Sequence, residues 1–229
     1  MILINQKTII RQLKGLEEGI FNSFYIPIVK DEGSSIGRLV PINTQLANDS
    51  LIIDNLRKWR QKYMKYFLTQ FVATNEKTQL WLNNSVLLDD TRILFLIQDE
   101  EDKWIGNFGI CNIREKEAEL DNLIRGEKGG DQKLIFYAEI SLMRWIYKNL
   151  GIEDIYLHVF SNNSRTINLH SSVGFEISKI YQLVKTKTDQ QIQYNVNLNQ
   201  SFSEHEDELG LVKMIMDKKY FLQKHRQSE

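Results

Sequence analysis

A strand, a short glycine-bearing loop and a long helix are predicted in direct succession between residues 118 and 150. Residues 118–124 alternate apolar and polar side chains, as a strand with one buried face does. Residues 134–150 repeat apolar side chains near helical spacing, and Gly151 follows as a stop signal. The loop between them places free backbone N–H groups at a helix start, where the helix dipole stabilises an anion. This segment therefore predicts a phosphate-binding turn within a sheet.

Patterns on either side of this segment predict an α+β fold with a mixed sheet. Antiparallel strands are expected first, and strands and helices alternate after residue 118, which differs from a doubly wound pattern. Asn43 or Thr44 is expected to open a helix that runs through Trp59, and Thr74 is a plausible N-cap of the next helix. The remaining expected elements are strands at 36–40, 92–98, 104–113, 155–160, 175–187 and 211–216, and a short helix at 164–171.

Three regions are predicted along the chain. Residues 1–34 form an N-terminal extension, because the turn cluster Asp31–Ser35 separates them from the rest of the chain. Residues 35–217 form one domain. Residues 218–229 form a polar C-terminal tail that is expected to fray.

Composition excludes several classes of partner and site. The formal net charge of the 229 residues is −1, so no overall field favours nucleic acid or an anionic membrane. Cys111 is the single cysteine, which excludes an internal disulfide, and its apolar neighbours favour a buried structural thiol over a nucleophile. No Cys/His cluster suggests a metal site.

The sequence also lacks the signals of secretion and membrane insertion. The N-terminus has no long apolar segment, and no apolar run approaches the roughly 20 residues that a membrane helix needs. A cytoplasmic protein is expected. The sequence does not set the oligomeric state, and a homodimer is compatible with it.

A second landmark comes after the strand at 155–160. Residues 163–175 read Asn-Ser-Arg-Thr-Ile-Asn-Leu-His-Ser-Ser-Val-Gly-Phe. With the earlier loop and helix, this segment resembles the GNAT superfamily of N-acyltransferases, over roughly residues 36–216. That family shows Arg/Gln-x-x-Gly-x-Gly/Ala before its central helix, and later an Asn, a small helix with Leu-Tyr, and Gly-Phe. The chain departs from the pattern in three respects: Lys128 stands where the first loop glycine is expected, the segment from strand to loop is shorter than usual, and His170 replaces the common Tyr.

The resemblance implies a GNAT-like, mostly antiparallel central sheet flanked by helices, and acetyl-CoA as cosubstrate with a small amine as acceptor. Backbone groups near Leu123 and Ile124 would polarise the thioester carbonyl, as oxyanion donors do. Asn163 would hydrogen-bond the pantetheine or cap the short helix. The loop residues expected to hold the diphosphate are Arg125, Gly126, Lys128, Gly129 and Gly130.

Acyl transfer to an amine needs a base, because the attacking nitrogen must be neutral. Strand alternation places Glu119, Asp121 and Leu123 on one face. Glu119 matches a base position of some family members and is the first candidate, with Asp121 second; exposed carboxylates on a solvated face are the alternative. His170 is the candidate acid for the departing thiolate, or a structural helix histidine. His158 is expected to be structural.

The acceptor is the least constrained part of the prediction. A Trp-Arg pair near the first helix, with the segment from Glu119 to Gly126, looks like GNAT enzymes that acetylate nucleotide-linked amino sugars in surface-glycan pathways. The candidate acceptor-binding residues are Arg57, Trp59, Arg60 and Trp81, or else the tryptophans are core and the arginines solvated. Two alternatives stay open: acetylation of another amine, such as a protein N-terminus or polyamine, and a catalytically silent acyl-CoA-binding module.

Overall fold

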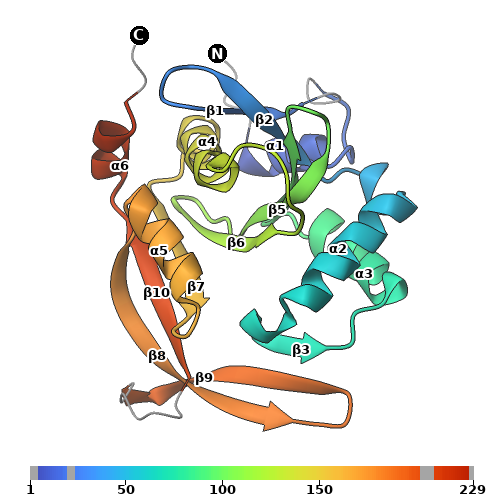
Figure 1. Ribbon diagram of the computed structural model, residues 1–229, viewed down its shortest axis with the longest axis vertical. Helices are drawn as coiled ribbons and strands as arrows, with labels where there is room; N and C mark the ends of the chain where they lie inside the picture. The colour runs from blue at the N-terminus through green and yellow to red at the C-terminus, as the bar shows by residue number, and fades with distance from the viewer. Residues whose placement is uncertain (1–4, 20–23, 202–208, 227–229) are drawn as a thin grey trace.

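A ten-stranded sheet runs through the residues that the computed structural model describes, which are 5–19, 24–201 and 209–226 (Figure 1). Its order is β1-β2-β4-β5-β6-β7-β10-β8-β9-β3, and every neighbouring pair is antiparallel except β6 and β7. The mixed sheet predicted from the sequence is confirmed. The strands are β1 (Ile26–Val29), β2 (Ser35–Pro41), β3 (Thr69–Phe71), β4 (Ile93–Asp99), β5 (Trp104–Cys111), β6 (Glu117–Arg125), β7 (Asp154–Phe160), β8 (Glu176–Lys187), β9 (Gln191–Ser201) and β10 (Gly210–Met216).

Helices cover both faces of this sheet, and capping side chains begin several of them. Asp49 caps α2 by accepting from two backbone N–H groups, and Thr74 caps α3 as predicted. The helices are α1 (Gln6–Leu13), α2 (Ser50–Lys62), α3 (Asn75–Trp81), α4 (Leu134–Asn149), α5 (Ser164–Val173) and α6 (Lys218–Lys224), with short turns η1 (Leu46–Asn48), η2 (Met64–Tyr66) and the π-helical η3 (Leu82–Leu87). None of the described helices has the length and apolarity to cross a bilayer.

Alternation along the central strands divides the core into two layers. Ile93, Phe95 and Ile97 of β4 join a cluster with residues of α1, α4 and α6. Leu94 and Leu96 face the other way and pack with α2 and η3. The second layer lies on the side of the sheet where Figure 1 shows α2 and α3, and we call the strand face on this side the acceptor face.

The single parallel pair is short. Strands β6 and β7 are in register only from Glu117 opposite Asp154 to Leu120 opposite Leu157, and both strands continue beyond that point. Their ends therefore leave backbone groups that no neighbouring strand pairs across this fork. The fork lies at the centre of the sheet order, so residues from both halves of the sheet can meet at it.

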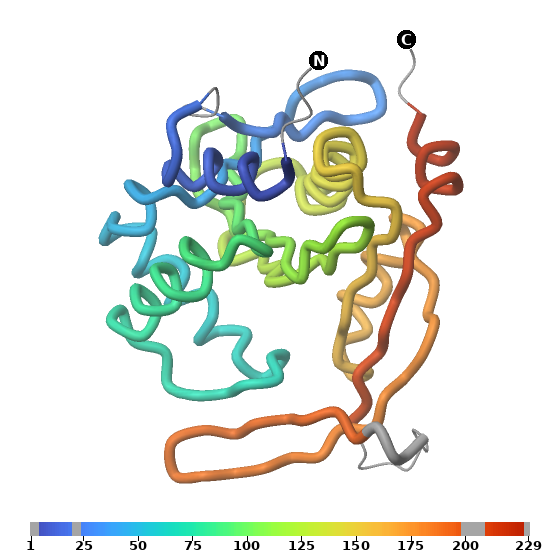
Figure 2. Tube along the Cα trace, turned by 180° about the vertical axis from the view of Figure 1, so that it is seen from behind, coloured from blue at the N-terminus to red at the C-terminus, as the bar shows by residue number. Residues whose placement is uncertain are grey.

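The far end of the sheet returns toward α2. Strand β9 pairs with β3 from Gln191 opposite Phe71 to Gln193 opposite Thr69, although β3 follows α2 early in the chain. Figure 2, which views the molecule from behind, shows the β8–β9 hairpin beside β3. The Thr69 hydroxyl donates to the Gln193 side chain at 2.7 Å, which ties this corner together. The acceptor face thus has a border built from both halves of the chain.

Several predicted boundaries are wrong. The limit at residue 34 falls inside the β1–β2 hairpin, and α1 is buried in the first layer, so the N-terminal segment is part of the domain. The helix expected from residue 43 or 44 begins at Ser50, because Asp49 supplies the cap. The predicted polar tail contains α6, whose Phe221 is fully buried; residues 227–229 lie outside the described part.

Truncation of Leu13 tests whether the N-terminal segment belongs to the core. Leu13 is 1% exposed, so Leu13→Ala should lower the free energy of unfolding by about 2–5 kcal/mol, as loss of buried methyl groups does. Urea denaturation followed by fluorescence measures the change. Lys7 lies on the same helix with a mostly exposed side chain, and Lys7→Ala should change the value by less than about 0.5 kcal/mol. Equal, small effects would mean that α1 is a detachable extension.

Candidate active site

A β-bulge in β6 lies just beyond the fork. Asp121 pairs with Gly109 and Ile124 pairs with Asn107, so β6 uses three steps where β5 uses two. Asn122 lies in the bulge and has a φ of +53°, a backbone conformation that Asn tolerates better than most other residues. The bulge reverses the alternation, and Leu123 packs with the first core layer. The expectation that Leu123 shares a face with Glu119 and Asp121 is therefore wrong.

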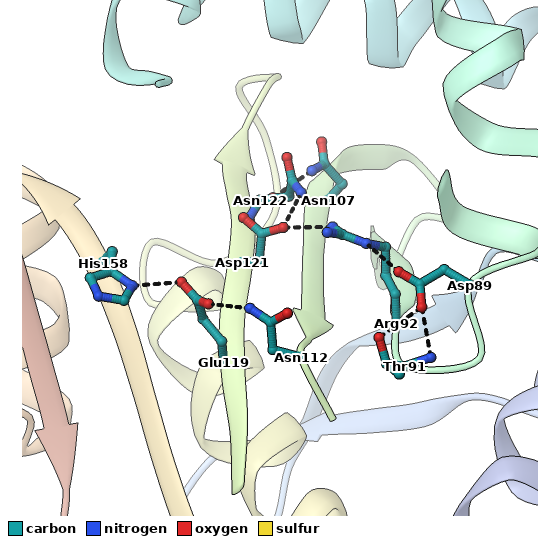
Figure 3. A network of polar contacts seen from close by, with 9 residues as sticks. All are labelled: Asp89, Thr91, Arg92, Asn107, Asn112, Glu119, Asp121, Asn122 and His158. Atoms are coloured by element: carbon teal, nitrogen blue, oxygen red, sulfur yellow. Dashed lines mark hydrogen bonds and ion pairs between the residues drawn. The ribbon is translucent and has the colours of Figure 1, made fainter. Parts of the chain in front are cut away.

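Glu119 lies beside the fork on the acceptor face, and donors occupy both of its carboxylate oxygens. His158 Nδ1 is 2.7 Å from Oε1, and the Asn112 side-chain nitrogen is 2.7 Å from Oε2 (Figure 3). Burial raises the pKa of Glu119, but the His158 contact, the Asn112 bond and the charge of Arg92 outweigh it and lower the pKa below its usual value. Glu119 is thus an ionised, fully hydrogen-bonded carboxylate.

Asp121 is held by a cation on the opposite side of β6 from His158. Arg92 Nη1 lies 2.7 Å from Asp121 Oδ2, and the Asn122 amide donates to the same oxygen at 2.6 Å (Figure 3). Arg92 also lies beside Asp89, at 3.8 Å. Asp121 therefore has its own counter-ion, which makes it less available than Glu119 to an incoming amine.

The predicted phosphate loop connects β6 to α4 and is exposed from Glu127 to Gly130. Within the described residues, the backbone N–H groups of Lys128, Gly129 and Gly130 donate to no protein group. The side chain of Arg125 donates to the Gly129 carbonyl at 2.6 Å. Free N–H groups before a helix form the arrangement that binds anionic phosphate.

Helix α2 supports this loop from the acceptor face. Trp59 Nε1 donates to the Glu127 carboxylate at 3.0 Å, and its ring lies so close to Gly126 that an added Cβ would be 2.2 Å from it. Tyr63 donates to the Arg125 carbonyl and Lys62 to the Gly126 carbonyl, each at 3.0 Å. The C-terminal half of α2 thus fixes where the loop begins.

The two candidates on α5 differ in what they contact. Asn163 caps the helix by accepting from the Thr166 backbone N–H, which confirms the capping alternative. His170 is 3% exposed, and its Nδ1 lies 2.7 Å from the fully buried Glu139 of α4. Its ring also packs edge-on against Phe175. These contacts favour the structural alternative for His170 over a role as the acid.

The four candidate acceptor-binding residues lie in different environments in the structure. Trp59 is buried in the second core layer, and Trp81 packs partly buried against it, so core packing explains both. Arg57 is paired with Asp54 at 2.8 Å on the surface of α2. Arg60 packs against Phe67 and interacts electrostatically with Asp121. The alternative of core tryptophans and solvated arginines therefore describes Trp59, Trp81 and Arg57.

Arg60 is a partly buried cation that has no carboxylate within 4.0 Å among the described residues. Burial lowers its pKa to about 10, against the opposing effect of Asp121. The guanidinium carbon lies 3.4 Å from the centre of the Phe67 ring, and Nη2 donates to the Thr69 carbonyl at 3.1 Å. Among the described residues it forms no ion pair within 4.0 Å, and its Nε is buried without a hydrogen-bond partner.

Sequence reasoning missed two members of the site, His158 and Arg92. His158 follows the last paired residue of β7, and alternation from the buried Leu157 was the available signal that it faces away from the core. Arg92 precedes β4 and reaches Asp121 from a distant part of the sequence, for which no local signal exists. The expectation for Cys111 holds: it is buried, and burial raises the pKa of its thiol.

Comparison with protein families now decides the class. A family model described as "Acetyltransferase (GNAT) domain" matches residues 52–196, more than half of the chain. The chain belongs to the GNAT acetyltransferase family. It is accordingly an acyltransferase with acetyl-CoA as acyl donor, and the fold and cosubstrate expected from the sequence are confirmed. No curated protein matches the chain.

Solved structures agree with this fold. A spermidine N-acetyltransferase from Vibrio cholerae, solved with CoA and spermine, has a TM-score of 0.59 and 18% identity, covering 80% of this chain and 96% of that one. A ribosomal L7/L12 alpha-N-protein acetyltransferase has a TM-score of 0.62 and 12% identity, with 85% and 94% covered. A probable GNAT-family acetyltransferase from Chromobacterium violaceum has a TM-score of 0.59 and 10% identity, covering 87% of this chain and 93% of that one. At these identities the likeness concerns the fold alone.

A substitution at Gly130 tests the loop. Gly130 has φ +63°, and an added Cβ would lie 3.0 Å from Asp99 and Leu134, so Gly130→Val should distort the loop and weaken CoA binding at least about tenfold by calorimetry. Gly151 has φ +65° in open space at the other end of α4. Gly151→Val carries a similar backbone strain, about 1–2 kcal/mol, and should leave CoA affinity unchanged. Equal affinities in both variants would remove the loop from the cofactor site.

Proposed function

We propose that this GNAT enzyme transfers the acetyl group of acetyl-CoA to the primary amine of a nucleotide-linked amino sugar. The observation that carries the choice of acceptor is Arg60, a partly buried cation that interacts electrostatically with Asp121 and whose Nε has no hydrogen-bond partner. Glu119 supplies the carboxylate of the base, and the loop from Arg125 to Gly130 holds the cofactor diphosphate. Backbone groups beyond the bulge polarise the thioester carbonyl.

The position of Glu119 supports its role. It lies on the acceptor face one residue before the last paired position of β6, where the two strands begin to separate. Its carboxylate is ionised and therefore ready to take part in proton removal from an ammonium group. Asp121 is the second candidate base, and its ion pair with Arg92 makes it the weaker one.

Arg60 supports an acceptor that carries negative charge as well as an amine. A partly desolvated guanidinium with a buried, unpartnered Nε is costly, and a phosphate or carboxylate from a ligand lowers that cost through charge-assisted hydrogen bonds. Nucleotide diphosphates present such groups, and Phe67 beside Arg60 offers an apolar surface for a base or sugar. Helix α2 and strand β3 hold Arg60 at the border of the acceptor face.

A polyamine is the main rival acceptor, because one structural neighbour was solved with spermine. A polycation requires surplus negative charge around the amine. On this acceptor face Arg92 neutralises Asp121, and Arg60 adds a further positive charge. With the ionised Glu119 included, the two carboxylates and two guanidiniums balance, so these residues offer a polycation no surplus negative charge. Two further alternatives are tested as well: a protein N-terminus as the acceptor, and a catalytically silent module that binds acyl-CoA.

An acceptor panel tests the proposal directly. The enzyme is incubated with acetyl-CoA and, separately, amino-sugar nucleotides, spermidine, or a peptide with a free N-terminus, and thiol release is followed. Turnover on at least one amino-sugar nucleotide at a kcat/KM about 100-fold above spermidine is expected, a difference of about 2.7 kcal/mol in transition-state binding. Preference for spermidine or the peptide contradicts the proposed acceptor. Thermal stabilisation by CoA without turnover on any amine identifies a silent module.

Arg60→Met should raise KM for the amino-sugar nucleotide about tenfold or more, with a smaller effect on KM for acetyl-CoA. The reason is that methionine fills part of the space over the Phe67 ring, where the guanidinium lies, but lacks the charge that binds the acceptor anion. Lys58 lies on the same helix and is mostly exposed, so Lys58→Met is the matched control with unchanged KM. Equal KM values for Arg60→Met and the wild type would reject the anion-binding role.

A further inference from the structure

Two side chains from different strands meet beside the fork between β6 and β7. The last paired positions are Leu120 and Leu157, and His158 is the next residue of β7. His158 and Glu119 lie on the same face, with Nδ1 and Oε1 separated by 2.7 Å. Figure 3 shows the histidine ring reaching from β7 toward the Glu119 carboxylate on β6. An imidazole therefore stands at the point where the strands separate.

The contact fixes which ring nitrogen carries the proton. An ionised carboxylate only accepts hydrogen bonds, so Nδ1 of His158 must be the donor. The neutral ring then has its lone pair on Nε2. Within the described residues Nε2 makes no hydrogen bond, and 24% of the side chain is exposed. His158 thus presents a free basic nitrogen on the acceptor face.

Glu119 is less suited to take the proton itself. Its two oxygens already accept from His158 and Asn112, and only 17% of its side chain is exposed. The same contacts lower its pKa below the usual value, which weakens it as a base. A carboxylate in this situation is better placed to orient an imidazole and to stabilise its charged form.

We propose that Nε2 of His158 accepts the proton of the acceptor amine, and that Glu119 acts as its positioning residue through Nδ1. This inference rests on the proposed function, since it specifies the base in the same acetyl transfer. The amine nitrogen forms a bond to the thioester carbonyl carbon, and the C–S bond breaks with its electron pair on sulfur. The proton lost by nitrogen passes to Nε2 and then to the thiolate or to water, which regenerates the neutral ring.

Charged and titratable groups around His158 come from each strand beside it. Glu119 faces it from β6, and Lys213 is its register partner on β10. Tyr156 packs edge-on at 5.6 Å on the same strand, and Tyr181 of β8 lies with its ring centre 6.2 Å away. Glu119 is the group in hydrogen-bond contact with the ring, and the Lys213 ammonium lies over the Tyr156 ring, 4.5 Å from its centre.

The test compares His158→Asn with Glu119→Gln under saturating acetyl-CoA. Asparagine keeps an N–H donor for Glu119 but has no basic nitrogen, so kcat should fall about 10²–10³-fold. The side-chain carbonyl introduced by Glu119→Gln can still accept from Nδ1, so kcat of that variant should fall only about tenfold. The acid limb of the kcat/KM profile should be lost in His158→Asn, and added imidazole should restore activity to His158→Ala. Tyr156→Phe, next to the ring, should keep wild-type kcat.

A reversed order, with Glu119→Gln far below His158→Asn, would show that Glu119 alone is the base and would overturn the proposal. So would a His158→Asn variant within about twofold of wild type, since loss of a general base costs about 10²-fold or more. A nitrogen-15 NMR titration of the histidines needs no acceptor and decides the question even if every amine fails. A neutral His158 protonated on Nδ1 supports the proposal, and protonation on Nε2 overturns it. Failure of all amines would contradict the proposed function separately.

Discussion

Strands β6 and β7 stay paired for only four residues each before they separate, and the site depends on this interruption. Beyond Leu120 the backbone of β6 passes through a bulge at Asn122, which turns the residues after it relative to the strand before them. The separation exposes backbone groups at the centre of a sheet, where they would normally be satisfied by a neighbouring strand. It also brings Glu119 and His158 to the start of the opening, and leads β6 directly into the glycine-bearing loop.

The described carboxylates around the opening each have a hydrogen-bond or ion-pair partner. Glu119 is matched by His158 and Asn112, and Asp121 by Arg92. Such pairing is expected, because a buried charge without a partner is costly. Arg60 departs from this pattern. In the proposed function, an anionic group of the acceptor supplies the ion-pair partner that Arg60 lacks among the described residues.

The sequence predicted the architecture well because periodicity reports local structure. The succession of strand, loop and helix from residue 118 to 150, and the strands after it, follow from apolar spacing and end signals. The bulge at Asn122 has no periodic signature, so Leu123 was assigned to the wrong face. Contacts between distant segments were equally inaccessible: Arg92 reaches Asp121, and β1 and α6 join the domain, through packing that no single segment encodes.

The pairing between β3 and β9 joins two segments that are far apart in the chain. Thr69, whose carbonyl accepts from Arg60, is fastened to Gln193 across more than half of the chain. Contacts of such long sequence separation form late, since closing the intervening loop costs entropy before any contact rewards it. During synthesis, the border that holds Arg60 remains open until residues 191–193 have left the ribosome. The β3–β9 border that positions Arg60 is therefore completed late in the synthesis of the chain.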